Sequence, residues 1–168
     1  MDYGTISRVL FGILLLNEAW VIGRSTPEQR AEVVQPRLLP LFGLLLLLPF
    51  FVALQLPAWL ALPILALQAA GLLLEVLSEL QLSRANSYAV SHQAATQPQA
   101  VGMYRYLENP IYTGLSMQFL AWGLFMPLSL ICFALQLESC RKMVHKEREY
   151  LHQTFQFVHR GIDSFLWN

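Results

Sequence analysis

The chain has 168 residues and a net charge of zero; 55% of its residues are hydrophobic and only 13% are charged. Soluble domains carry about 25% charged residues, so this composition indicates a membrane protein. A neutral chain offers no strongly basic face for phosphates, which speaks against a nucleic-acid partner. The length suits one domain, residues 1–168.

Five apolar segments are candidates for transmembrane helices. A bilayer core about 30 Å thick needs about 20 apolar residues in helical form. In chain order the segments are residues 5–23, 38–56, 58–77, 111–126 and 128–144, and the third is expected to continue as helix to about Leu82. The fifth crosses only if its helix runs on through the charged stretch after Glu138, or if the last hairpin is tilted or shallow. We predict an all-α integral membrane bundle of about five transmembrane helices with a cytoplasmic C-terminal helix.

The basic residues orient this bundle. Ten of the eleven Lys and Arg fall on one side of a five-span arrangement, in residues 24–37, 83–109 and 138–168, and Arg8 is the exception. Cytoplasmic loops carry the excess of Lys and Arg. The opening MDYGTISR has an acid and no basic cluster, so we expect the first span to be retained rather than cleaved as a signal peptide. The prediction is a multi-pass protein with its N-terminus outside and its C-terminus cytoplasmic.

Acidic residues lie near the inner ends of two spans. Glu18 lies about a turn and a half from the inner end of the first span, and Glu75 and Glu79 stand four positions apart at the inner end of the third. An acid inside a membrane is costly, which makes it a functional candidate. The alternative is an interfacial acid that pairs with Arg24 or Arg84 or reaches water.

Histidine and cysteine patterns predict no metal site. His145, His152 and His159 repeat every seven residues, which is about 10.5 Å along a helix. Ligands of one tetrahedral ion lie about 2 Å from it, so this spacing is too wide. Cys132 and Cys140 are expected to be free thiols.

The most informative stretch is GMYRYLENPIYTG, residues 102–114. Asn109 is a good helix cap and Pro110 suits the first helical position. A helix N-terminus there is a ready site for an anionic group. Gly102 and Gly114 allow close backbone approach. The alternative is an aromatic belt at the membrane surface beside a capped helix.

This stretch resembles the signature of membrane methyltransferases related to isoprenylcysteine carboxyl methyltransferase, roughly G-x-Y-x-x-x-R-H-P-x-Y-x-G. Its E-N-P-I-Y-x-G portion also looks like the N-P-M-Y-x-G of phosphatidylethanolamine N-methyltransferases. EREYLHQTFQ, residues 147–156, is similar to the second family signature, E-E-x-x-L-x-x-x-F-G. LQLSRANSYAVS is similar to the family's L-G-R-x-x-S segment, so the resemblance covers roughly residues 75–160.

The resemblance implies an integral-membrane methyltransferase that uses S-adenosylmethionine. Its acceptor would be lipid-like, either a prenylcysteine carboxylate or an amine headgroup. The cofactor would lie on the cytoplasmic side, between the loop 83–109 and the tail 138–168. The residues that the motifs place around the cofactor are Gly102, Tyr104, Asn109, Pro110, Tyr112, Gly114, Glu147 and Leu151.

Three charged residues are candidates for contacts with the reacting groups. Arg105 or Arg141 would take the carboxylate of the cofactor or of an acidic acceptor, and Glu108 would suit a cationic acceptor. For both arginines the alternative is an inner-face cation that meets anionic lipid.

Several positions depart from the family pattern. Glu108 stands in place of Arg, Asn109 in place of His, and Arg148 in place of the second Glu. Loss of the basic residue weakens the case for a carboxylate acceptor. The alternative function is a non-catalytic membrane subunit or assembly protein on the same scaffold, with a protein partner. A reductase related to sterol reductases and using NADPH is disfavoured, because their pattern has an acid where this chain has Leu115.

Overall fold

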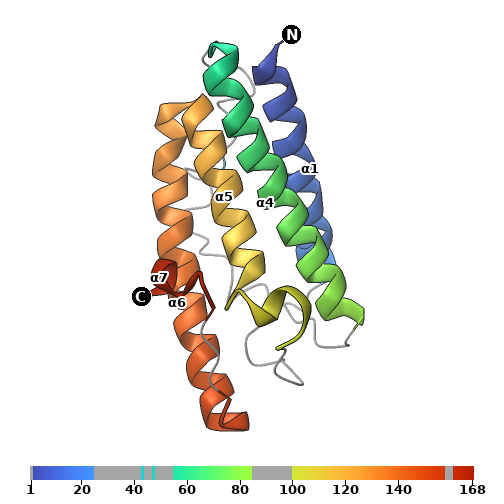
Figure 1. The fold of residues 1–168 in the computed structure, drawn as a ribbon, viewed down its shortest axis with the longest axis vertical. Helices are drawn as coiled ribbons and strands as arrows, with labels where there is room; N and C mark the ends of the chain where they lie inside the picture. The colour runs from blue at the N-terminus through green and yellow to red at the C-terminus, as the bar shows by residue number, and fades with distance from the viewer. Residues whose placement is uncertain (1, 25–42, 44–46, 48–54, 85–99, 158–160) are drawn as a thin grey trace.

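The computed structural model of the protein describes residues 2–24, 43, 47, 55–84, 100–157 and 161–168. Four long helices lie side by side in this part of the chain (Figure 1): α1 (Tyr3–Arg24), α4 (Ala58–Arg84), α5 (Pro110–Phe125) and α6 (Leu130–Phe155). The shorter elements are η2 (Gly102–Arg105), η3 (Pro127–Ser129) and α7 (Ser164–Trp167). Every regular element in the described ranges is helical, which confirms the all-α prediction.

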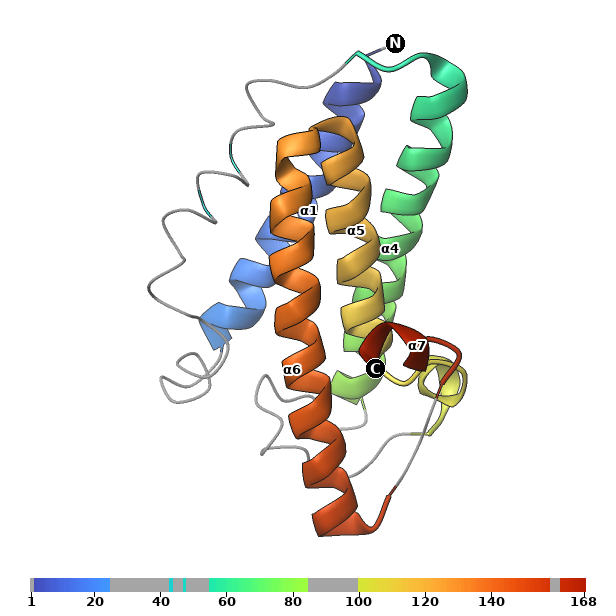
Figure 2. The ribbon, with the colours of Figure 1, turned by 90° about the vertical axis from the view of Figure 1, so that its left-hand side faces the viewer.

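Helix α5 packs against α4, α6 and α1. Its start lies at the end of the bundle where α4 stops, and η3 turns the chain from α5 into α6 (Figure 2). Aromatic residues join α1 to α5: the ring of Phe11 stacks on Trp122 with centroids 4.3 Å apart and meets Phe119 edge-on at 5.5 Å. All three side chains are buried. One core cluster therefore sits on the faces that α1 and α6 turn toward α5, and a second lies between α4 and α5.

Two glycines bring α4 and α5 into backbone contact. A Cβ atom built on Gly114 would lie 2.6 Å from the carbonyl oxygen of Gly71, and one built on Gly71 would lie 2.6 Å from the carbonyl oxygen of Gly114. Small residues permit such close helix crossings in membrane bundles. The close approach expected at Gly114 is confirmed.

Replacing Gly114 by alanine should push these two helices apart. The added methyl group meets backbone atoms of α4, which cannot move as a side chain can, so we expect a loss of about 1–3 kcal/mol in the free energy of unfolding. Gly12→Ala is the matched control, because nothing lies within 4 Å of its Cβ position in α1. Thermal unfolding in detergent measures both, and equal stability of the two variants would contradict the close crossing.

Several predicted spans coincide with helices. Residues 5–23 and 58–77 fall inside α1 and α4, and α4 continues to Arg84. Helix α6 runs without a break through the charged stretch after Glu138, as the fifth span required. The second predicted span, 38–56, falls almost wholly outside the described residues.

Membrane crossing is supported for one helix. Among the helices in the described ranges, α4 over Ala58–Leu82 alone is long and apolar enough to cross a bilayer by length and composition. Helix α5 has only 16 residues. Five transmembrane helices, and the orientation of the termini, therefore stay predictions.

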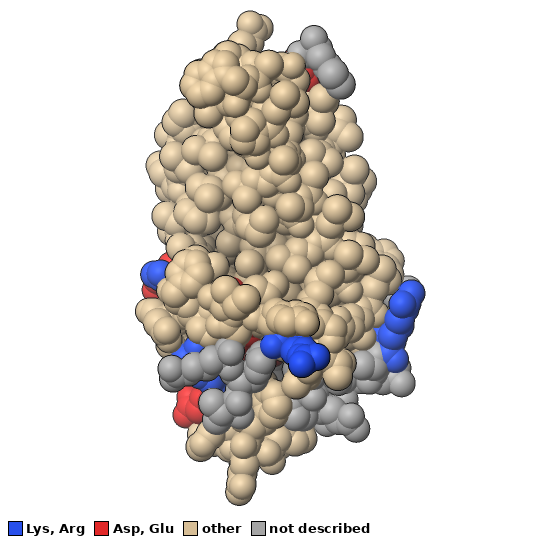
Figure 3. Space-filling model, in the orientation of Figure 1, with Lys and Arg blue, Asp and Glu red and all other residues tan. Residues whose placement is uncertain are grey.

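Charged side chains gather toward one end of the molecule. Figure 3 shows this on one face: Lys and Arg lie toward the end where α4 stops and α5 begins, and the opposite half of the face is almost free of charge. The signature stretch 102–114 and the C-terminal helix α7 also lie toward this end (Figure 2). On this face the charged side chains are thus concentrated toward that end.

Candidate functional site

The signature stretch begins with a turn that α4 holds in place. Gly102 has a φ of +58°. Residues that carry a side chain rarely adopt this left-handed backbone conformation. The amide of Gln81 spans this turn: its Nε2 donates to the carbonyl of Val101 at 2.5 Å, and its Oε1 accepts from the Met103 amide at 3.2 Å. A Cβ at Gly102 would collide with this Gln81 side chain. Gly102 therefore shapes the entry into η2.

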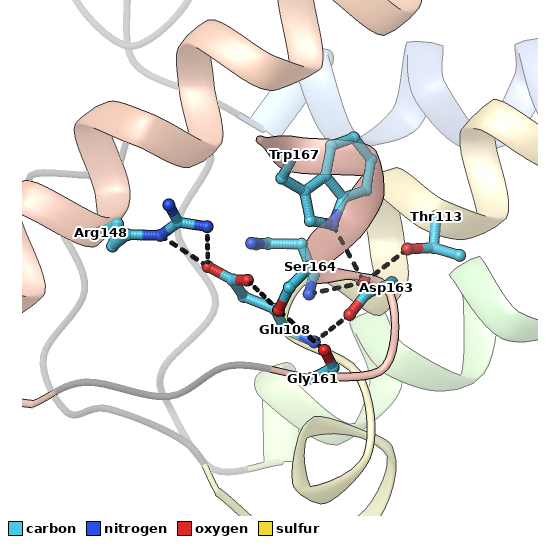
Figure 4. A network of polar contacts seen from close by, with 8 residues as sticks. Glu108, Thr113, Arg148, Gly161, Asp163, Ser164 and Trp167 are labelled. Carbon is cyan, nitrogen blue, oxygen red and sulfur yellow. Dashed lines mark hydrogen bonds and ion pairs between the residues drawn. The ribbon is translucent and has the colours of Figure 1, made fainter.

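The start of α5 is held by an acid from the far end of the chain (Figure 4). Asp163 accepts hydrogen bonds from the backbone amides of Glu108 at 2.5 Å and Asn109 at 3.1 Å. It also accepts from the Thr113 hydroxyl at 2.7 Å and the Trp167 indole at 3.1 Å. Asp163 is only 2% exposed. Its carboxylate thus fixes the backbone just before Pro110.

The prediction that Asn109 caps α5 is therefore wrong in one respect. Asn109 does occupy the N-cap position of α5, and Pro110 opens the helix, but the Asn109 side chain makes no capping hydrogen bond. The carboxylate at this helix end is the chain's own Asp163 rather than that of a ligand. A free anion site at the α5 N-terminus is not what the structure shows.

The pKa of Asp163 reflects these contacts. Burial alone would raise it, but hydrogen bonds from Thr113, the two backbone amides and Trp167 outweigh burial and hold the pKa below its ordinary value. Asp163 is therefore a carboxylate at neutral pH. The negative charge of Asp163 interacts favourably with the partial positive charge at the N-terminus of α5.

Glu108 and Arg148, two residues that depart from the family pattern, form an ion pair with each other. Arg148 in α6 donates from Nε to Glu108 Oε1 at 2.9 Å, and its terminal nitrogen lies 2.9 Å from the same oxygen. Ser164 donates to the other oxygen of Glu108 at 2.8 Å (Figure 4). The Glu108 side chain is 7% exposed and that of Arg148 22% exposed. Acid and base have exchanged places relative to the pattern, and in this chain they form an ion pair.

This pairing changes the role expected of Glu108. The sequence suggested a carboxylate available to a cationic acceptor. In the structure both of its oxygens already accept hydrogen bonds from the protein. Glu108 ties α6 and the C-terminal segment to the signature stretch.

Tyr112 of the first signature and Glu147 of the second lie at the same end of the bundle. They interact electrostatically, and Tyr104 of η2 also interacts with Tyr112. Tyr112 further meets Trp167 edge-on, with ring centroids 6.4 Å apart. Burial, with the nearby Glu108 charge, raises the pKa of Glu147 to about 7. Glu147 thus titrates near neutral pH.

The remaining predicted residues are more dispersed. Arg105 is exposed, and its guanidinium lies 5.8 Å from the ring centroid of Tyr106. Arg141 donates from Nε to the carbonyl of Leu166 at 2.7 Å, so it holds the C-terminal segment. Leu151 is partly buried near the end of α6. Gly114 serves the contact with α4 described above.

The sequence profile of a family described as phospholipid methyltransferase matches residues 59–156, more than half of the chain. The chain belongs to the phospholipid methyltransferase family. The match includes all of α4 except Ala58, both signature segments and the whole of α6. Searches of curated proteins and of solved structures found no match. Membership confirms the resemblance that the signatures indicated.

The C-terminal segment lies beyond the part that matches the phospholipid methyltransferase profile. Motif comparison therefore missed Asp163, Ser164 and Trp167, although they hold the signature stretch in place. One signal was available: Asp163 is the only acid in GIDSFLWN, a segment otherwise rich in apolar residues. A buried acid in such a segment needs partners.

Proposed function

We propose that this protein is a membrane enzyme that transfers the methyl group of S-adenosylmethionine to a lipid-like acceptor. The observation that carries the proposal is the meeting of the two family signatures: Glu108 of the first accepts a hydrogen bond from Arg148 of the second at 2.9 Å. The Arg148–Glu108 ion pair joins the same two segments. Family membership supports methyltransferase chemistry.

The polar groups at this meeting point suit the proposed cofactor. Within the described residues, neither the Glu147 carboxyl nor the Tyr112 hydroxyl makes a hydrogen bond. Glu147 would accept from the ribose hydroxyls or the ammonium group, and the faces of Tyr104 and Tyr112 would attract the sulfonium charge. The cofactor supplies an activated methyl group, while the protein positions the reactants and excludes water.

An amine headgroup is the better acceptor of the two that the sequence left open. A carboxylate acceptor needs an available cation, but Arg148 is paired with Glu108 and Arg141 is engaged with Leu166. Arg105 is exposed beside Tyr106, where it would contact the phosphate of a phospholipid rather than its reacting end. We place this site on the cytoplasmic side of a multi-pass protein, with the N-terminus outside.

Calorimetric titration of S-adenosylmethionine into the detergent-purified protein tests the cofactor site. Tyr112→Ala and Glu147→Gln should each weaken binding at least about tenfold, since a hydrogen bond to a charged group contributes about 1.5–3 kcal/mol. Glu138→Gln is the matched control, because Glu138 is an exposed acid of the same helix. It should bind like the unmodified protein.

The pH dependence of binding supplies a second readout. The pKa of Glu147 is about 7, so its carboxylate form increases as the pH rises from 6 to 8. Affinity should rise over this range in the unmodified protein and stay flat in Glu147→Gln. A folded protein without affinity for S-adenosylmethionine would instead support a non-catalytic membrane subunit. Unchanged binding in both variants would remove Tyr112 and Glu147 from the site.

A further inference from the structure

Three acids converge inside the bundle. Glu18 comes from α1, and Glu75 and Glu79 come from one face of α4, one helical turn apart. One carboxylate oxygen of each lies within 4.8 Å of those of the other two. Glu75 is fully buried and Glu79 is 8% exposed. The sequence made these acids functional candidates, and in the structure Glu75 and Glu79 are buried within the bundle.

Three carboxylates lie close together here, and two of them, Glu75 and Glu79, are buried. Each charge loses hydration on burial, and each repels the other two. A bound cation would offset this repulsion.

The amide of Gln118 favours a cation. This α5 side chain is fully buried, and its Nε2 donates to Glu75 Oε2 at 2.7 Å. Its Oε1, on the same amide carbon and therefore beside the same carboxylate, has no hydrogen-bond partner among the residues described. An unpaired buried amide oxygen costs about 1–3 kcal/mol. A cation held between the carboxylates would take this oxygen as a further ligand.

The donor set and its dimensions suit a hard divalent ion. Carboxylate and amide oxygens are the ligands of Ca²⁺, which sits about 2.3–2.6 Å from each of them. Oxygens on opposite sides of such an ion are about 5 Å apart, which accommodates the 4.8 Å limit observed here. Asn17 bridges Glu75 Oε1 and Glu79 Oε2 at 3.1 and 2.9 Å, and it fixes the two carboxylates side by side.

We propose that Glu18, Glu75 and Glu79, with the amide oxygen of Gln118, form a binding site for a divalent cation of the Ca²⁺ type. The site joins α1, α4 and α5, so the ion would tie the three helices together. It lies near the cofactor site proposed above, since Glu18 also interacts electrostatically with Tyr112. The inference goes beyond the proposed function and does not depend on it, because ion binding needs no methyl transfer.

Calorimetric titration of CaCl2 into the full chain, purified in a zwitterionic detergent and stripped with chelator, tests the site. We expect saturable binding by the unmodified protein and a rise in its thermal unfolding midpoint on Ca²⁺ addition. Glu75→Gln should lose at least about tenfold in affinity, because it replaces a charged ligand and keeps the shape of the side chain. Glu138→Gln on the exposed part of α6 should bind Ca²⁺ as the unmodified protein does.

Glu18→Gln provides a second variant if Glu75→Gln does not fold, since Glu18 is only partly buried. Three results would overturn the site: no uptake of Ca²⁺, Mg²⁺ or Mn²⁺ by the folded unmodified protein, equal Ca²⁺ affinity in the variants and the unmodified protein, or binding of methylammonium chloride in place of any metal. The last would identify an ammonium pocket. Because S-adenosylmethionine is titrated separately, failure here leaves the proposed function standing.

Discussion

Replacing Asp163 by alanine is expected to destabilise the protein by about 3 kcal/mol or more. The change leaves four donors without their acceptor: the amides of Glu108 and Asn109, the Thr113 hydroxyl and the Trp167 indole. A buried donor left unpaired costs about 1–3 kcal/mol, and some of the four will find water. For a chain of this length each kcal/mol lowers the unfolding midpoint by about 2–4 °C. Thermal unfolding in detergent measures the loss.

Two controls separate the loss of this anchor from a general effect of removing an acid. Asp2→Ala also removes hydrogen bonds to a backbone amide and a hydroxyl, those of Gly4 and Thr5, but this acid is exposed and should matter far less. Trp167 is fully buried, so the Asp163 variant should also show red-shifted tryptophan emission as α7 comes away. Equal stability of both variants would show that the segment is not held by Asp163.

The contribution of Asp163 to the stability of the fold should change with pH in a definite direction. Because the folded pKa of Asp163 is lowered, its contribution to stability is fully present above the ordinary value of 3.8 and is lost as the pH falls through the folded value. Asp163→Asn should lack this part of the acid dependence.

The effects of charge reversal at Glu108 and at Arg148 on the free energy of unfolding are expected to be strongly coupled. Glu108→Arg alone places two guanidinium groups together, and Arg148→Glu alone places two carboxylates together, so each should destabilise the fold. The double variant restores opposite charges and also restores the arrangement of the family signatures. Close partners in one network show coupling free energies of about 0.5–3 kcal/mol. Unfolding midpoints of the four proteins give this value.

The exposed pair Glu138–Lys142 is the matched comparison. Its nitrogen–oxygen distance is 3.3 Å, but the two side chains are 56% and 63% exposed. Exposed pairs contribute little, so exchanging these charges should give little coupling. If the double variant at positions 108 and 148 is no more stable than the single ones, the two departures from the pattern do not compensate each other.

This compensation bears on function. Taken singly, Glu108 and Arg148 suggested a chain that has lost its chemistry, because each removes a residue of the signatures. In the structure the two residues form one ion pair that joins the signature stretch to α6. The two departures are therefore linked to each other and are not independent losses.

The sequence by itself determined the helices and the family. Apolar runs of sufficient length predicted α1 and α4, Asn109-Pro110 predicted the start of α5, and the spacing of the signatures indicated membrane methyltransferases. These features are local, because helix formation, turn geometry and motif spacing depend on neighbours within a few residues. The fit of Gly114 against another helix was also foreseeable, since only glycine lacks a side chain at a crossing.

Only the tertiary structure decided which distant groups meet. Glu108 and Arg148 are 40 positions apart, Glu108 and Asp163 are 55 apart, and Asn17 and Glu75 are 58 apart. A pattern along the chain indicates which face of a helix is buried, but not which polar partner a buried face will meet. For a buried acid, the partner determines its structural role. Asp163 holds the start of α5, Glu108 forms an ion pair, and Glu75 belongs to an interior cluster of acids. Burying a carboxylate without partners costs several kcal/mol of free energy. The packing of the helices, which brings the partners near, therefore determines what each acid does.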